Sequence, residues 1–302
     1  RDLVIVTLAS KVWVYGFKSM SLLDSIETTH NPKGLCCLSS GERAVLVCPG
    51  MQQGSALVVF YPKGYGDRAV DKPLERERTM IISAHESAIA AMALDSSCSF
   101  LATASEKGTI VRVYDTVSGG DSRPQELRRG LDRAEIHSLT FSQSGEFLAA
   151  SSDKGTVHIF AVCRPGGGSS ASSVSGGYPA SEASGTANAK SSLQRLSRVL
   201  PSYFSSEWSL AQFRVHDYRY IAAFGTDAHT VIIVCANGSY YKARFDPIKG
   251  GEMVREEYHQ FDDASVESQS SSRQTSASLQ GLRAGRHRSE HAGEQPGGDS
   301  LQ

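Results

Sequence analysis

A short marker recurs along this chain and constrains its fold: a glycine, then serine or threonine, then a strand-like run of apolar or alternating residues. The copies begin at Gly54, Gly108, Gly155 and Gly238, so the glycines are separated by 54, 47 and 83 residues. A period of about 40 to 50 residues built from short strands and glycine turns is typical of β-propeller blades. The sequence therefore predicts an all-β chain of four-stranded, WD40-like blades.

Two copies of the marker also match residue by residue. Residues 100–109 align with residues 147–156, and both runs indicate a strand, a tight acidic-Lys-Gly turn and a second strand. Each run follows another apolar strand, at residues 89–94 and 136–141. A further copy, without the glycine, opens the chain at residues 3–15. The repeats predict consecutive blades of the same build.

An insertion over residues 162–207 accounts for the longest interval between the glycines. Its first part is Gly, Ser and Ala, which cannot bury enough apolar surface to offset the entropy of ordering, so we expect a flexible loop. Its later part predicts a helix over residues 192–200 that ends at Pro201, because apolar residues fall there at helical spacing: Leu193, Leu196, Val199 and Leu200. Either this helix faces a membrane or it packs on its own blade.

The remaining sequence sets the expected domain organisation. Residues 208–215 predict a strand that rejoins the blade, with Trp208 in the core. Residues 1–261 are expected to form a partial propeller, and residues 262–302, which lack apolar periodicity, a disordered tail. Without insertion and tail the chain has room for about five blades, and it begins without Met inside a strand. Either the propeller is short or N-terminal blades are missing before Arg1.

Composition excludes several functional classes. The chain of 302 residues has a net charge of −1, which argues against broad nucleic-acid binding. No apolar run approaches the roughly 18 residues of a membrane span. The six cysteines show no C-x-x-C spacing, which favours buried cytosolic thiols over disulfides or zinc ligands. No nucleophile–base signature, metal-ligand spacing or phosphate loop is found, so we expect no enzyme, no metal and no cofactor.

Between the two matching repeats lies Leu127-Arg128-Arg129-Gly130. Side chains alternate along a strand, so two adjacent arginines point to opposite sides and one strand can supply a guanidinium to each of two pockets. The planar fork of a guanidinium suits phosphate oxygens. An isolated Arg-Arg pair, by contrast, is more often two solvated side chains in a loop. Its place between the repeats favours a phosphate-binding role.

These residues resemble a known family. The Leu-Arg-Arg-Gly run between two blades is similar to the L/F-R-R-G motif of the PROPPINs, seven-bladed propellers that bind phosphoinositides in autophagy. Other segments resemble the family in the same order, among them residues 31–35, 84–87, 102–109, 151–160, 200–206 and 238–242. The resemblance covers residues 1–261 except the Gly/Ser loop, which is longer than expected, and about two N-terminal blades have no counterpart.

The resemblance implies two lipid-headgroup pockets, one on each side of the double arginine. By position, the first pocket comprises His85, Thr103, Ser105, Gly108, Thr109, Arg112 and Arg128. The second comprises Arg129, Gly130, Ser152, Thr156 and His158. Arginines pair with phosphates, hydroxyls donate to ligand oxygens and glycine lets the backbone approach. Alternatives stay open: His85 can be a structural propeller histidine, His158 can face solvent, and the hydroxyl residues can be ordinary strand and turn positions.

The resemblance also implies a function. A member of the family is a cytoplasmic, peripheral membrane adaptor at phagophore, preautophagosomal or endosomal membranes. Its ligand is phosphatidylinositol 3-phosphate, with the 3,5-bisphosphate as a second candidate. Its partners are an autophagy lipid-transfer protein or other autophagy proteins, with no nucleic acid. The rival interpretation is a protein-only WD-repeat scaffold whose arginine pair binds acidic peptides.

Overall fold

The computed structural model describes residues 3–39, 41, 43–62, 74–118, 123–163, 187–189, 206–217 and 219–261. Within these residues the chain is all-β, with 21 strands in five sheets, which confirms the predicted fold class. Residues 1–261 form one compact unit. The predicted helix over residues 192–200 and the predicted tail over residues 262–302 lie outside the described residues.

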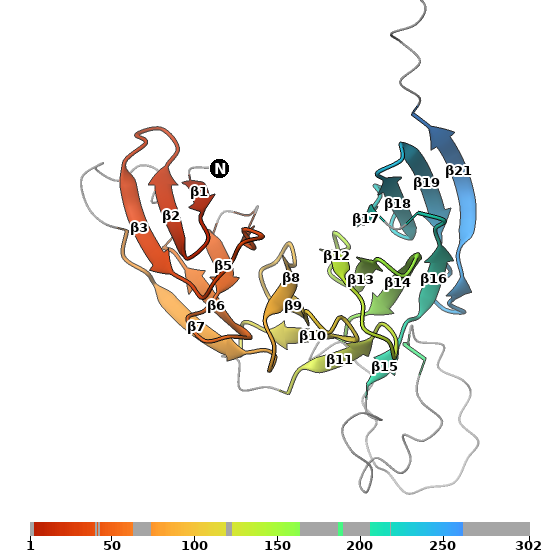
Figure 1. Ribbon diagram of the computed structural model, residues 1–302, viewed down its shortest axis with the longest axis horizontal. Coiled ribbons are helices and arrows are strands. Elements are labelled where there is room, and N and C mark those ends of the chain that lie inside the picture. Colours follow the sequence, from red (N-terminus) through yellow and green to blue (C-terminus); the bar gives the residue numbers. More distant parts are fainter. Residues whose placement is uncertain are drawn as a thin grey trace, which may run out of the picture. The chain divides into compact units, whose positions relative to one another are not determined.

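The five sheets follow one another in chain order and are numbered I to V here (Figure 1). Sheet I contains β1 (Leu3–Thr7), β2 (Lys11–Gly16) and β3 (Leu22–Glu27). Sheet II contains β4 (Cys37–Leu38), β5 (Val45–Pro49), β6 (Ser55–Phe60) and β7 (Arg78–Ser83). Sheet III contains β8 (Ile89–Leu94), β9 (Phe100–Ser105), β10 (Ile110–Asp115), β11 (Gln125–Arg128) and β15 (Glu207–Trp208).

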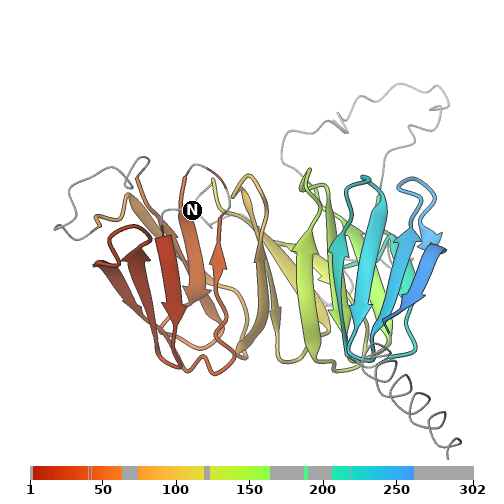
Figure 2. The same cartoon turned by 90° about the horizontal axis from the view of Figure 1, so that it is seen from above.

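Sheets IV and V complete the described fold. Sheet IV contains β12 (Ile136–Phe141), β13 (Phe147–Ser152), β14 (Thr156–Ala161), β16 (Ala211–Arg214) and β20 (Gly251–Glu252). Sheet V contains β17 (Tyr220–Phe224), β18 (Thr230–Cys235), β19 (Ser239–Arg244) and β21 (Val254–Gln260). Figure 2 shows the strands of consecutive sheets standing side by side. The antiparallel meander within each sheet is what the repeated strand–turn–strand pattern predicts.

The recurring glycines have a conformational reason. All four adopt positive φ, from +62° at Gly108 to +85° at Gly238, a region that L-residues with a side chain rarely occupy. Space is a second restriction, because a Cβ placed on Gly108 would lie 1.9 Å from the carbonyl oxygen of Ala134. The marker is therefore a requirement of the turn between the second and third strands of the blade. This accounts for Gly108 without any ligand.

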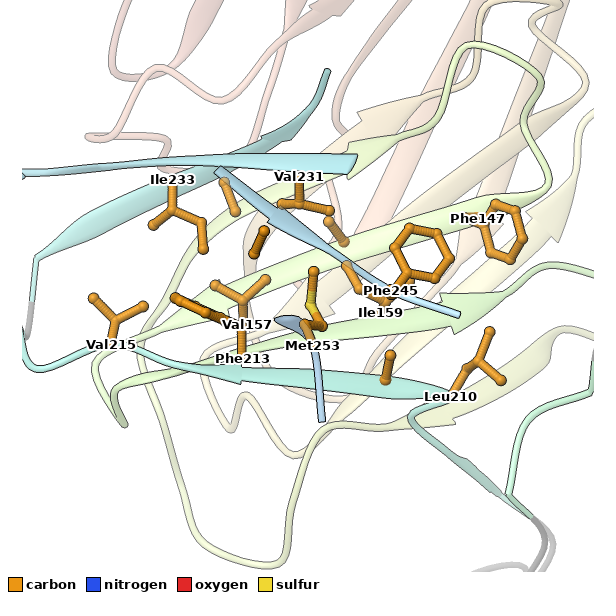
Figure 3. Packing of buried hydrophobic residues seen from close by; sticks show 14 of the residues in the cluster. Phe147, Val157, Ile159, Leu210, Phe213, Val215, Val231, Ile233, Phe245 and Met253 are labelled. Atoms are coloured by element: carbon orange, nitrogen blue, oxygen red, sulfur yellow. The ribbon is translucent and has the colours of Figure 1, made fainter. Parts of the chain in front are cut away.

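Apolar packing between neighbouring sheets forms the core. Four clusters of buried side chains join I to II, II to III, III to IV and IV to V. Side-chain alternation directs one strand to both neighbours: Leu148 and Ala150 of β13 pack toward sheet III, whereas Ala149 packs toward sheet V. Figure 3 shows the IV–V cluster, in which Val157 and Ile159 of β14 lie close to Val231 and Ile233 of β18.

Three sheets depart from the expected four strands. Sheet I has three described strands, and sheets III and IV each gain a two-residue strand that pairs in parallel at the outer edge, β15 on β11 and β20 on β16. The prediction of a single strand over residues 208–215 is therefore wrong. The segment pairs first with sheet III and then with sheet IV, so it must break between them. Trp208, expected in the core, is only half-buried.

The cysteines differ in exposure. All six cysteines are free, and Cys48 and Cys235 are buried, but Cys163 is exposed, so the expectation of buried thiols is wrong there. Burial raises the pKa of the Cys48 thiol to about 12, which keeps it protonated. Within the described ranges, no helix has the length and apolar character needed to cross a bilayer.

We expect the IV–V cluster to dominate the stability of sheet V. Ile233 is fully buried in this cluster, whereas Ile221 of the same sheet is 59% exposed. Ile233→Ala should lower the free energy of unfolding by about 2–5 kcal/mol, because it removes buried methyl groups and leaves a cavity. The matched control Ile221→Ala should change it by less than about 0.5 kcal/mol. Urea denaturation measures both, and equal losses would contradict the assigned core.

Candidate functional site

The double arginine lies at the start of the connection from sheet III to sheet IV. Arg128 is the last residue of β11, and Arg129 and Gly130 begin the connection to β12 (Figure 1). The backbone N–H groups of Arg129 and Gly130 donate to the carbonyl of Thr109, at 3.0 and 3.4 Å. The turn of one blade thus anchors the start of the next. A Cβ on Gly130 would have no neighbour within 4 Å, so no packing contact requires glycine there.

The two arginines face different sheets. Leu127 packs in the III–IV cluster, so alternation along β11 directs Arg128 to the other face of sheet III, toward sheet II. Arg128 is 2% exposed, and its Nε donates to the hydroxyl of Ser206 at 2.7 Å. Arg129 is 6% exposed, and its guanidinium donates to the carbonyls of Gly108, at 3.0 Å, and Asp132. Neither arginine is a solvated loop residue.

The buried charge of Arg129 forms no ion pair with the described residues. No carboxylate of the described residues lies within 4.0 Å of its guanidinium; its hydrogen bonds go to neutral carbonyls. Burial lowers the pKa of Arg129, and the more distant Asp153 and Asp132 oppose this. Burying an unpaired cation is costly. An arrangement of this kind favours an arriving anion, because the anion removes that cost.

Four residues of the first predicted pocket share one face of sheet III. Thr103, Arg112 and Glu126 are cross-strand neighbours, and Arg128 follows Glu126 by two residues, so all four lie on the face toward sheet II. Ser105, two residues after Thr103, is on the same face and buried. Thr109 lies just before β10, where its carbonyl holds Arg129 and Gly130.

Two members of the first pocket already have structural partners. Arg112 forms an ion pair with Glu126 at 2.9 Å and donates to the carbonyl of Ala84 at 2.7 Å. His85 Nε2 lies 3.0 Å from the hydroxyl of Thr103, and burial, aided by Arg112, lowers its pKa to about 4. These contacts favour the alternative in which His85 is a structural histidine of the propeller. Ligand binding by the first pocket stays a prediction centred on Arg128.

The second predicted pocket occupies the equivalent face of sheet IV. Ser152, Thr156 and His158 lie on the face toward sheet III, where His158 stacks on Phe160 with ring centroids 6.2 Å apart. His158 is buried, and its Nδ1 lies 3.2 Å from the hydroxyl of Ser209. Burial and then Arg129 lower its pKa to about 4, so it is neutral at pH 7. The alternative that His158 faces solvent is therefore wrong.

Sequence analysis missed three polar partners of these pockets. Glu126 neutralises Arg112, Ser206 contacts Arg128, and Ser209 contacts His158. Ser206, at the end of the insertion, and Ser209, just after it, lie 78 and 51 residues from their partners. Only the charge of Glu126 opposite Arg112 on neighbouring strands was a usable signal. The predicted membrane-facing side chains, Leu193, Leu196, Val199 and Leu200, lie outside the described residues.

We expect His158 to make stability depend on pH. Its pKa in the folded chain, about 4, is below the ordinary value of 6.5, so the unfolded chain takes up the proton first as the pH falls. Its contribution is complete above about pH 6.5 and is lost as the pH falls toward 4. His158→Gln should therefore lose less stability than the parent between pH 7 and 4, as urea titrations would show. The exposed His259→Gln should follow the parent.

This chain is similar to a family of known proteins. A profile of the PROPPIN family matches residues 1–261. Autophagy-related protein 18e of Arabidopsis thaliana is 38% identical over 264 residues, covering 86% of this chain and 62% of that protein. WD repeat domain phosphoinositide-interacting protein 2 of Xenopus laevis is 32% identical over 273 residues, covering 87% and 58%. The chain thus spans about 60% of the length of these relatives.

A solved structure agrees in fold. Hsv2 of Kluyveromyces lactis superposes with a TM-score of 0.60 at 20% identity, over 87% of this chain and 72% of that one. Identity at this level shows the fold alone, a β-propeller assembled from blades like sheets I to V. The profile match covers the whole described fold, including the double arginine between sheets III and IV. This chain belongs to the PROPPIN family.

Proposed function

We propose that this chain is a non-enzymatic peripheral membrane adaptor. It binds phosphatidylinositol 3-phosphate, with the 3,5-bisphosphate as a second candidate, through the two pockets that flank Leu127-Arg128-Arg129-Gly130. The bound protein recruits autophagy machinery to membranes. The observation that carries this proposal is the buried guanidinium of Arg129, which has no carboxylate partner among the described residues and an uncrowded glycine beside it.

The electrostatics support a phosphate ligand. His85 and His158 are neutral at pH 7, so the positive charge of the pockets comes from arginine. A guanidinium pairs with a phosphate through two parallel hydrogen bonds, and such charge-assisted bonds contribute about 1.5–3 kcal/mol each. Two pockets on one rigid body gain further by effective concentration when both headgroups belong to one membrane. Binding would be reversible and confined to membranes rich in the lipid.

The names of similar proteins favour the same function. Relatives are described as autophagy-related, and the Xenopus laevis protein as phosphoinositide-interacting. A similar solved structure is a complex of KlAtg21 with the coiled coil of AgAtg16. That complex favours a helical autophagy protein as one partner class for this chain. An autophagy lipid-transfer protein is a second partner that we propose from the sequence resemblance.

We predict that Arg128→Thr/Arg129→Thr abolishes flotation with vesicles containing phosphatidylinositol 3-phosphate. Each single variant should retain weak binding, reduced about 10- to 100-fold, because each arginine belongs to a different pocket. Both arginines are buried, so thermal melts must show that the double variant is folded. Arg128→Lys/Arg129→Lys keeps the charge but loses the planar fork, and should also bind poorly.

The control for this experiment removes two positive charges elsewhere. Lys242→Thr/Arg244→Thr lies on sheet V and should bind like the parent. Binding by the folded double-threonine variant at parental strength would refute the site. Loss of acidic-peptide binding with unchanged vesicle binding would favour the protein-only scaffold.

A further prediction concerns the insertion. We propose that Leu193, Leu196, Val199 and Leu200 enter the boundary between headgroups and acyl chains as a short interfacial helix, with the basic residues nearby meeting anionic lipid. Leu196→Asp/Leu200→Asp should lower vesicle affinity at least tenfold, because each buried aliphatic side chain contributes about 1.5–3 kcal/mol. Soluble inositol 1,3-bisphosphate should bind the variant and the parent equally. Equal vesicle affinity at matched lipid composition and salt would leave this segment as blade packing.

A further inference from the structure

Two described stretches of the insertion, residues 187–189 and 206–207, meet at the outer edge of sheet III. Asn188 is 6% exposed, and its amide clasps Ala161: the Ala161 N–H donates to Oδ1 at 2.7 Å, and Nδ2 donates to the Ala161 carbonyl at 2.7 Å. Nδ2 also donates to the carboxylate of Glu207 at 2.7 Å. One amide therefore ties the end of β14 to β15.

A second amide completes the attachment. Gln125, the first residue of β11, donates to Glu207 at 2.8 Å and to the Ala161 carbonyl at 3.1 Å, and accepts from the N–H of Cys163 at 3.0 Å. The Trp208 N–H donates to the carbonyl of Ala189 at 2.9 Å. We name Gln125, Asn188 and Glu207 the amide clamp. Its members hydrogen-bond one another beside the buried Asn188, which favours one fixed arrangement.

The clamp determines where Ser206 lies. A parallel strand of two residues, Glu207–Trp208 against Leu127–Arg128, has little stability of its own, so the clamp must hold it in register. Ser206 directly precedes Glu207, and in this register its hydroxyl receives the Nε–H of Arg128 at 2.7 Å. A bond at Nε fixes the plane of the guanidinium. Arg129 has other partners, the carbonyls of Gly108 and Asp132, and does not depend on this segment.

We propose that Asn188, Glu207 and Ser206 are positioning residues of the pocket at Arg128: the clamp seats Ser206, and Ser206 orients the guanidinium toward a phosphate-bearing ligand. The pocket at Arg128 is then composite, because residues of the insertion complete it. The pocket at Arg129 is built without them. This inference rests on the function proposed above, and it assigns to these three residues a role in one pocket only.

The test examines each pocket separately, in a variant that lacks the arginine of the other pocket. The Arg129→Thr protein retains only the pocket at Arg128, and the Arg128→Thr protein only the pocket at Arg129. Soluble inositol 1,3-bisphosphate is titrated into each and followed by NMR. Ser206→Ala and Asn188→Ala should each weaken binding about tenfold in the Arg129→Thr background, the size expected for one hydrogen bond to a charged group. Neither should change binding in the Arg128→Thr background.

Two controls show whether the effect is positional. Ser206→Thr keeps the hydroxyl and should restore binding in the Arg129→Thr background. Ser239→Ala removes another buried hydroxyl, the one that bonds Gln260 at 2.8 Å in sheet V, and should affect neither background. Equal losses in both backgrounds, or no loss in the Arg129→Thr background, would overturn the inference. If the parent chain itself does not bind the headgroup while folded, the proposed function fails, and this inference with it.

Discussion

Face-to-face apolar packing between consecutive sheets is the constraint on which the rest of this structure depends. Each inner sheet must bury both of its faces. Side chains alternate along a strand, so neighbouring residues such as Leu148 and Ala149 enter opposite clusters. A chain that leaves one sheet must therefore cross to the next beside their shared cluster. The crossing from sheet III to sheet IV is the Arg128–Gly130 segment. Packing, rather than local preference, directs Arg128 toward sheet II and places Arg129 at the crossing to sheet IV.

Burial gives these arginines their chemical character. A solvated arginine pair is screened and selects little, but arginine residues that are 2% and 6% exposed interact strongly with any anion that reaches them. Backbone carbonyls and one hydroxyl hold the donors in place without neutralising Arg129. Arg112, on the same face as Arg128, is neutralised by Glu126 and acts mainly within the fold. Position on a strand alone does not separate these two kinds of arginine.

Short parallel strands link consecutive sheets at their outer edges. β15 precedes β16 of sheet IV but pairs with β11 of sheet III, and β20 follows β19 of sheet V but pairs with β16 of sheet IV. In both places, a two-residue strand next in sequence to a strand of the following sheet pairs with the edge of the preceding sheet. At sheet III this link also brings Ser206 to Arg128. An insertion far along the chain thereby becomes part of the surroundings of the double arginine.

The sequence by itself determined the repeated strand–turn–strand pattern, the all-β class and the position of the double arginine between two blades, because alternation and glycine turns are local properties. The positive φ of Gly108 and Gly155 follows from the same local rules. Only the tertiary structure decided that His158 is buried and that Glu126 holds Arg112. It also decided that the strand expected over residues 208–215 divides between two sheets. These features depend on which faces meet and on partners far apart in the sequence, such as Leu127 and Glu207, and no local pattern encodes such distances.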